Sequence, residues 1–84
     1  MNFIFSNHAL EQMTRREISR EMVMQTLNQP QQFVEDMNDG SIVIYQSLIK
    51  ENEQSFLLRV FVNDDKQPNV IVTVYKTTKI AKYL

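Results

Sequence analysis

The sequence predicts an α+β domain in which two N-terminal helices pack on one face of an antiparallel meander sheet. Apolar residues recur with helical spacing as far as Asn28, and from Gln31 onward they alternate with polar residues. The alternating segments are joined by short turns, which favour antiparallel pairing of neighbouring strands. Helices followed by strands are typical of α+β architecture. The 84 residues have the length of a single domain.

Two helices are predicted ahead of the strands, the first ending at about Arg16 and the second covering residues 20–28. A short edge strand at residues 2–5 precedes them. Polar N-cap side chains accept hydrogen bonds from the free amides of a first helical turn, and a proline disfavours helical angles in the residue before it. The residues that mark the boundaries are Ser6 or Asn7, Ser19 and Pro30.

Four more strands follow from the alternating pattern. Side chains alternate across a sheet, so each parity of residue numbers marks one face. One set of even-numbered strand positions is apolar, and we expect this face to lie under the helices; it consists of Ile42, Ile44, Leu48, Phe56, Leu58, Val60, Val62, Val70, Val72 and Val74. Odd-numbered positions are mixed, and we expect them to form an open face. The strands are residues 31–36, 41–50, 54–63 and 68–77, with turns at 37–40, 51–53 and 63–68.

The expected register brings Arg59 to the centre of the open face, because a slip by one residue would bury its charge. A guanidinium beside phenols suits a phosphate, and aromatic rings can stack bases. The alternative is a surface arginine whose stem packs on Phe61. The register rests on pairing Leu48 with Phe56 and Phe61 with Ile71. The side chains expected around Arg59 are Tyr45, Phe61, Thr73 and Tyr75, and the same face carries Leu57 and Ile71.

The first helix and the C-terminal segment supply the other candidate residues. His8, the only histidine, lies on the polar side of the first helix with Gln12 and Arg16. These three form either an anion-contacting ridge or an ordinary solvated helix face. Residues 76–84 hold three lysines and no acid, among them Lys76 and Lys79. This segment is either part of an anion site or a solvated basic end.

Composition excludes several classes of site. The formal net charge of −1 argues against strong non-specific binding of nucleic acid, which depends on excess positive charge. One histidine and no cysteine leave no convincing zinc site, and one glycine rules out a glycine-rich phosphate loop. No apolar run approaches the roughly 18 residues that span a bilayer. We therefore expect a cytoplasmic protein with no cofactor, no metal and no membrane contact.

The motifs HALEQMTRREIS, MVMQTLNQP and VTVYKTTKIAKY resemble those of a small bacterial family designated domain of unknown function 4258, which looks related to the BrnT and RelE/ParE toxins. The resemblance covers nearly the whole chain. Gln12 departs from it at a usual arginine, and Glu17 departs at the usual glycine that ends the first helix in a left-handed conformation. The positions that match are His8, Met13, Arg16, Ile18, Ser19, Pro30, Tyr75, Lys76 and Lys79.

The resemblance implies a RelE/ParE-like fold and a toxin of a toxin–antitoxin pair. RelE-like members cut mRNA on the ribosome without metal, and ParE-like members inhibit gyrase by binding. A metal-free endoribonuclease would use His8 as base or acid, Arg59 and Lys76 as phosphate clamps, and Tyr75 as stacker or acid. The implied partners are an antitoxin protein or a second copy of the chain, with RNA or the ribosome as target. Further binding positions would be Arg16, Tyr45, Phe61, Thr73 and Lys79.

A different class of function stays open beside the enzyme. The near-neutral charge and the apolar residues Leu57, Phe61 and Ile71 on the expected open face also fit a non-catalytic module that binds a protein through that face.

Overall fold

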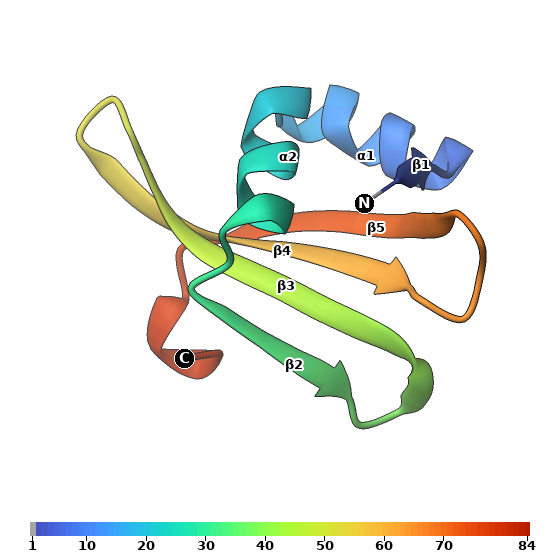
Figure 1. Ribbon diagram of the computed structural model, residues 1–84. Helices are drawn as coiled ribbons and strands as arrows, with labels where there is room; N and C mark the ends of the chain where they lie inside the picture. Colours follow the sequence, from blue (N-terminus) through green and yellow to red (C-terminus); the bar gives the residue numbers. More distant parts are fainter. Residues whose placement is uncertain (1) are drawn as a thin grey trace.

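The computed structural model describes residues 2–84, which form two helices and a five-stranded sheet. Both helices lie on the same side of the sheet, and a short 3-10 turn lies on the other side (Figure 1). The α+β prediction is confirmed. The elements are β1 (Phe3–Phe5), α1 (Asn7–Arg16), α2 (Arg20–Asn28), β2 (Gln32–Asp36), β3 (Asp39–Glu51), β4 (Gln54–Asn63), β5 (Asn69–Thr77) and η1 (Ile80–Lys82).

The sheet has the order β1-β5-β4-β3-β2, and it is mixed rather than wholly antiparallel. Strands β2 to β5 form the expected antiparallel meander. Strand β1 instead pairs in parallel with the first part of β5, from Phe3 opposite Asn69 to Phe5 opposite Ile71. Because β1 has only three residues, it covers only the start of the outer edge of β5.

Each helix begins where the sequence predicts, because a serine hydroxyl satisfies its first turn. Ser6 accepts a hydrogen bond from the amide of Ala9, and Ser19 accepts one from the amide of Met22, each over about 3 Å. Helix α1 ends at Glu17, whose φ of 55° and ψ of 48° are left-handed. This is the conformation for which glycine is the usual residue. Glu17 therefore adopts that conformation at a steric cost of about 1 kcal/mol.

The core lies between the helices and the centre of the sheet. Apolar side chains from α1, α2, β4 and β5 fill it, and partly buried aromatic residues of β1 and β3 border it. No helix among residues 2–84 is long and apolar enough to cross a membrane. The buried core residues are Ala9, Met13, Ile18, Val23, Leu27, Phe56, Leu58, Val60, Val62, Ile71 and Val74.

The parity rule is correct for β4 but wrong for β3, because the hairpin turn between them is one residue shorter than expected. Only Asn52 and Glu53 form the turn, with φ of 52° and 67°, and Glu51 pairs with Gln54. Two successive residues at positive φ are typical of the two-residue type I′ hairpin turn. Leu48 consequently pairs with Leu57 instead of Phe56. Every residue of β3 is thereby moved to the face opposite the expected one.

The parity rule also fails at the start of β5, where the ladder with β4 contains a bulge. Phe61 pairs with Thr73 and Val62 pairs with Ile71, which leaves Val72 as the extra residue. A bulge of one residue shifts the side chains on either side of it to different faces. Ile71, expected on the open face, is fully buried in the core, and Val72, expected in the core, is half-buried.

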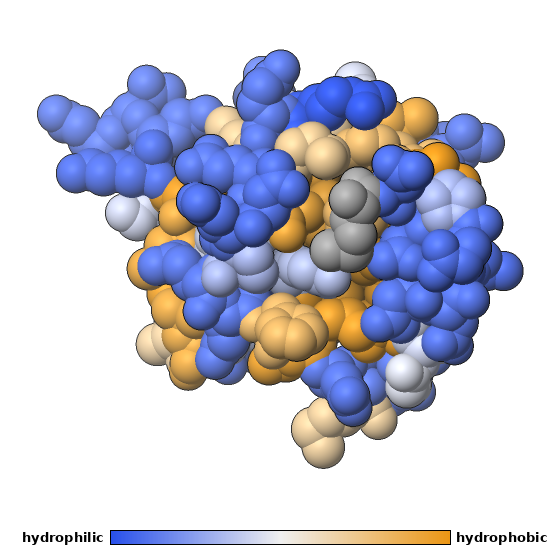
Figure 2. Space-filling model, viewed as in Figure 1, coloured by the Kyte–Doolittle hydropathy of each residue, from blue (hydrophilic) through white to orange (hydrophobic). Residues whose placement is uncertain are grey.

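The second sheet face is not open, because the C-terminal segment lies on it (Figure 1). The Tyr83 backbone carbonyl accepts a hydrogen bond from Gln46 Nε2 at 3.0 Å. Gln46 and Leu57, both on this face, are fully buried, and Ile44 is nearly so. The patch expected from Leu57, Phe61 and Ile71 is therefore not an exposed surface. Figure 2 shows where apolar surface does reach solvent, around the helix layer and the neighbouring part of the sheet.

Candidate functional site

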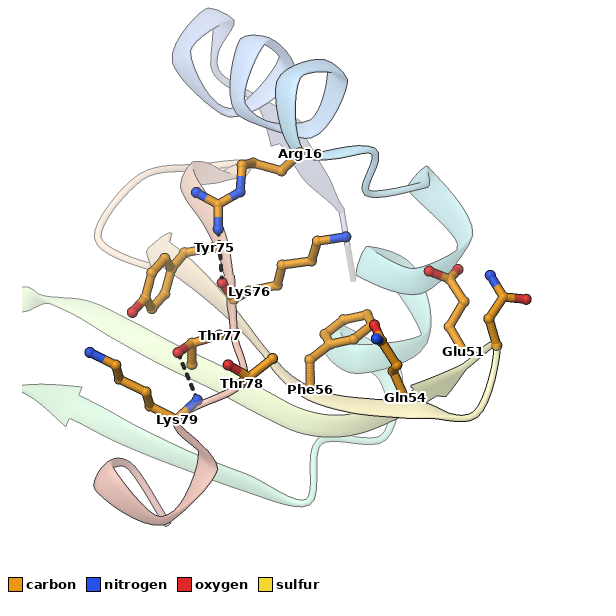
Figure 3. A pocket seen from close by; sticks show the side chains of 10 residues that line it. Arg16, Glu51, Gln54, Phe56, Tyr75, Lys76, Thr77, Thr78 and Lys79 are labelled. Carbon is orange, nitrogen blue, oxygen red and sulfur yellow. Dashed lines mark hydrogen bonds between the residues drawn. The ribbon is translucent and has the colours of Figure 1, made fainter.

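A basic hollow lies at the end of β5, where its outer edge is no longer covered by β1. It has a volume of about 400 Å³. The last residue of α1, the hairpin between β3 and β4, and the end of β5 converge on it (Figure 3). We call it the β5-edge pocket. It is lined by Arg16, Glu51, Asn52, Gln54, Phe56, Tyr75, Lys76, Thr77, Thr78 and Lys79.

Arg16 joins the helix layer to this pocket. Its Nη2 donates a hydrogen bond to the backbone carbonyl of Lys76 at 3.2 Å. That carbonyl lies on the stretch of β5 that β1 leaves unpaired. A backbone group at an open strand edge needs a partner, and the arginine side chain supplies it. The contact uses one of the five N–H donors of the guanidinium, so the others remain for a ligand.

The two lysines of the pocket lie on different sides of β5. In Figure 3, Lys76 extends toward Phe56, whereas Lys79 and Tyr75 extend the other way. Lys76 Nζ lies 5.0 Å from the centre of the Phe56 ring, a cation–π distance. The amide of Lys79 is held by the Thr77 hydroxyl at 3.0 Å. Three cationic side chains and one carboxylate, Glu51, therefore line the pocket, which gives it an excess of positive charge.

Tyr75 is the titratable hydroxyl of the pocket. A hydrogen bond with the Tyr83 hydroxyl at 3.2 Å, a second with Thr77 and the charges of Arg59 and Lys82 lower the pKa of the Tyr75 phenol from its ordinary value. Its ring meets that of Tyr83 edge to face, with the centroids 6.2 Å apart. A phenol with a lowered pKa donates its proton more readily than an ordinary phenol does.

Arg59 lies behind the pocket rather than in it. Its Nε donates to Oε1 of the buried Gln46 at 3.0 Å. Its guanidinium carbon lies 4.0 Å from the centre of the Tyr83 ring and 5.3 Å from that of Phe61. Tyr75 is its direct cross-strand partner, not its diagonal neighbour. Arg59 therefore reaches the pocket only through its charge, which acts on Tyr75.

Tyr45 is on the opposite face from Arg59, so the expectation that they are neighbours is wrong. The shorter hairpin turn pairs Tyr45 with Val60 and brings Gln46 opposite Arg59. Tyr45 contacts the ring of Phe3 edge to face at 6.4 Å and that of Phe33 at 5.8 Å. It belongs to an aromatic row on the helix side of the sheet, away from the phenols of the second face.

The remaining expected residues fall outside the pocket. His8 is exposed near the start of α1, eight residues before Arg16, which corresponds to about 12 Å along a helix. Its Nε2 lies 3.4 Å from Nε2 of Gln12. Phe61 and Thr73 are cross-strand partners on the second face. The structure thus brings together Arg16, Tyr75, Lys76 and Lys79, and it leaves His8, Arg59, Tyr45, Phe61 and Thr73 elsewhere.

Sequence reasoning missed the pocket residues that the hairpin contributes. Gln54 and Phe56 belong to β4, which pairs directly with β5, and Glu51 ends the strand before it, so the hairpin between β3 and β4 reaches the pocket (Figures 1 and 3). Thr77 and Thr78, in contrast, belong to the YKTTK run that had supplied Tyr75, Lys76 and Lys79. Hydroxyls between such cations could have been included on the same grounds. The described residues contain no group of three or more His, Cys, Asp or Glu side chains arranged to hold a metal ion.

The family model of DUF4258, described as a domain of unknown function, matches residues 5–76. The chain belongs to this family. The matched range spans both helices and runs through most of β5, so it includes Arg16, Tyr75 and Lys76, whereas Lys79 lies just beyond it. Comparison with curated proteins and with solved structures finds no match.

Proposed function

We propose that this DUF4258 domain is a toxin of the toxin–antitoxin type that cleaves RNA without a metal ion, and that the β5-edge pocket is its active site. The observation that carries the proposal is the lining of the pocket, in which Arg16, Lys76 and Lys79 occur together with the Tyr75 phenol. Cations beside a proton donor suit a phosphodiester, whose charge rises as it reacts. A relationship to the RelE/ParE toxins belongs to this proposal, supported by two N-terminal helices on one face of a largely antiparallel sheet.

The chemistry would proceed by attack of a ribose 2′-hydroxyl on the adjacent phosphorus. The bond from the 2′-oxygen to phosphorus forms, the bond from phosphorus to the 5′-oxygen breaks, and a 2′,3′-cyclic phosphate results. Water takes the proton of the attacking hydroxyl. Tyr75 donates its proton to the departing 5′-oxygen, which is the role its lowered pKa favours. Lys79, on the same side of β5, and Arg16 neutralise the phosphate that is cleaved, and Lys76 holds a neighbouring one (Figure 3).

The test is cleavage by the purified protein, in the presence of chelator, of free RNA and of mRNA on translating ribosomes. Tyr75→Phe should lower the cleavage rate by about 100-fold or more and leave RNA binding intact, since general acids contribute about that much. Lys76→Ala and Lys79→Ala should weaken binding and reduce its salt dependence. Lys66→Ala, in the exposed loop before β5, is the matched control and should change neither.

Two outcomes would count against the proposal. Absence of cleavage of both substrates at high protein concentration would exclude the ribonuclease. Cleavage that Tyr75→Phe leaves unchanged would exclude this pocket as its active site. The alternative function, a non-catalytic module that binds a protein, predicts a stable complex without cleavage. Such a module would need a surface other than the second sheet face as it was expected from the sequence, since Leu57 and Ile71 are fully buried.

A further inference from the structure

The outer edge of β2 is the least protected edge of the sheet. β2 is the last strand in the sheet order, and along the described chain only β3 pairs with it. Natural proteins shield such edges with lysines, prolines, bulges or a covering segment, and β2 has only a register shift between Glu35 and Asp36, at its end. Residues 32–36, Gln-Phe-Val-Glu-Asp, contain neither lysine nor proline, and all but Asp36 are exposed. The strand thus offers backbone groups to a further strand.

Apolar side chains accompany this edge. Phe33 is 63% exposed, Val34 is 37% exposed, and Met37 in the following turn is 98% exposed. Phe33 is nevertheless held in place, because one side of its ring rests against Tyr45 with the centroids 5.8 Å apart. Figure 2 shows apolar surface on this side of the molecule, below the helix layer. A fixed aromatic ring that shows most of its surface to water gives a partner an anchor without loss of side-chain freedom.

The same edge is acidic. Glu35 and Asp36 follow the apolar pair, and Asp39 begins β3 just beyond the turn. Local hydrogen bonds orient the two aspartates: Asp36 accepts from the amide of Asn38, and Asp39 accepts from the amide and hydroxyl of Ser41. No lysine or arginine occurs anywhere in residues 31–49. The negative potential of this edge is therefore not neutralised by its own sequence neighbours.

We propose that the outer edge of β2 accepts an extended segment of another protein in which two adjacent apolar residues neighbour two adjacent basic residues. Phe33 and Val34 point to opposite faces of the sheet, and Glu35 and Asp36 follow them at the end of the strand, where the ladder with β3 shifts register. A strand laid alongside would cover the first two with its apolar pair and meet the second two with its basic pair. This inference concerns a surface other than the β5-edge pocket and goes beyond the proposed function.

A second copy of the chain fits this edge less well than a basic segment does. Two copies of β2 paired antiparallel about Val34 would set Phe33 opposite Glu35 and Gln32 opposite Asp36. Each acid would then face an uncharged side chain, with no cation on the facing strand. A strand with basic residues at those positions would supply the opposite-charge pairs that a second copy lacks. Charge complementarity thus selects a basic partner.

The test uses four capped hexapeptides with the whole chain, titrated by fluorescence anisotropy and by amide chemical shifts. TRKVIT places its basic and apolar pairs correctly for antiparallel addition, and TIVKRT does so for parallel addition. TEEVIT and TIVEET are their acidic controls. We expect one basic peptide to bind about tenfold more tightly than its acidic control, with shift changes concentrated at residues 31–37.

Variants connect the binding to the edge. Phe33→Lys and Asp36→Lys should each weaken the basic peptide by about fivefold or more, whereas Glu11→Lys, an exposed acid on α1, should leave binding unchanged. Unaltered thermal melting of each variant shows that the fold is kept. Equal binding of acidic and basic peptides, shift changes at the β5-edge pocket instead, or no saturation up to about 1 mM would overturn the proposal. So would a dimer in ultracentrifugation that Phe33→Lys dissolves, because the occupant would then be a second copy.

Discussion

Arg59 was expected to bind a ligand, but its contacts in the structure are with other residues of the domain. Its guanidinium stacks on Tyr83 at 4.0 Å, and its Nε bonds the fully buried Gln46 at 3.0 Å. Without Arg59, the buried Gln46 Oε1 would lose this hydrogen-bond donor. The side chain therefore links β3, β4 and the C-terminal segment to one another.

Arg59→Ala should lower the free energy of unfolding by about 2 kcal/mol, from the lost hydrogen bond and the lost stacking. Arg59→Lys should recover little, because an ammonium cannot form the planar stack and donate from the Nε position together. Urea denaturation measures both, with Arg15→Ala, an exposed residue of α1, as control. An unchanged midpoint in Arg59→Ala combined with lost RNA cleavage would return Arg59 to the active site.

Glu17 is the other residue whose identity conflicts with its conformation. At φ 55° and ψ 48° it ends α1, and its amide bonds the carbonyls of Met13 and Thr14. Glu17→Gly removes the steric conflict and should raise the free energy of unfolding by about 0.5–1 kcal/mol. Glu21→Gly, within the first turn of α2, should lower the same quantity by about 1 kcal/mol. If both changes destabilise equally, the left-handed conformation carries no strain.

At the scale of the elements, the bulge in β5 decides which valine or isoleucine belongs to the core. Ile71→Asp places a charge among fully buried side chains, and it should abolish cooperative thermal melting. Val72→Asp, at the half-buried bulge position, should retain a melting transition at lower temperature. Val60→Asp serves as a second core variant and Thr73→Asp as a second-face variant that folds. A folded Ile71→Asp together with an unfolded Val72→Asp would restore the simple alternation.

The helices could be predicted from sequence because their signals are local: Ser6 and Ser19 accept the capping hydrogen bonds that their positions suggest. Strand faces depend instead on counting across turns and along ladders. The turn of Asn52 and Glu53 lacks the glycine that usually marks a type I′ turn. The sequence of β5 likewise contains no signal that predicts the bulge at Val72. The shorter hairpin turn places Tyr45 on the face opposite the expected one, and the bulge does the same for Ile71. Tyr75, Lys76 and Lys79, which are close to one another in the YKTTK run, line the same pocket.

At the scale of the whole molecule, both faces of the sheet are covered, each by a different part of the chain. The helices close the first face, and the segment that contains η1 closes the second through Tyr83. Gln46, Leu57 and Ile44 are buried on that second face. The basic tail predicted as either an anion site or a solvated end is therefore divided: Lys76 and Lys79 line the pocket, and Tyr83 packs against the sheet.

A chain shortened to residues 1–78 should lose stability by about 2–4 kcal/mol, because apolar and amide groups of the second face become exposed. It should also bind a hydrophobic dye that the full chain does not bind. Tyr83→Ala should cause part of the same loss, and Leu84→Ala, at an exposed position, almost none. If the shortened chain melts like the full one, the second face is stable without its cover.

The pairing of β1 with β5 has a consequence for the order in which the domain folds. Ser6 bonds the backbone of β5 through both its amide, to Ile71, and its hydroxyl, to Val72, and the hydroxyl contact spans a separation of 66 residues. Arg16 reaches Lys76 across 60. Hairpins between neighbouring strands close much shorter loops, so the meander of β2 to β5 should assemble before the N-terminal segment joins it. Ser6→Ala should then speed unfolding and leave the folding rate nearly unchanged, whereas Val60→Ala slows folding. On this route the β5-edge pocket is completed only in the last step, when the two ends of the chain meet.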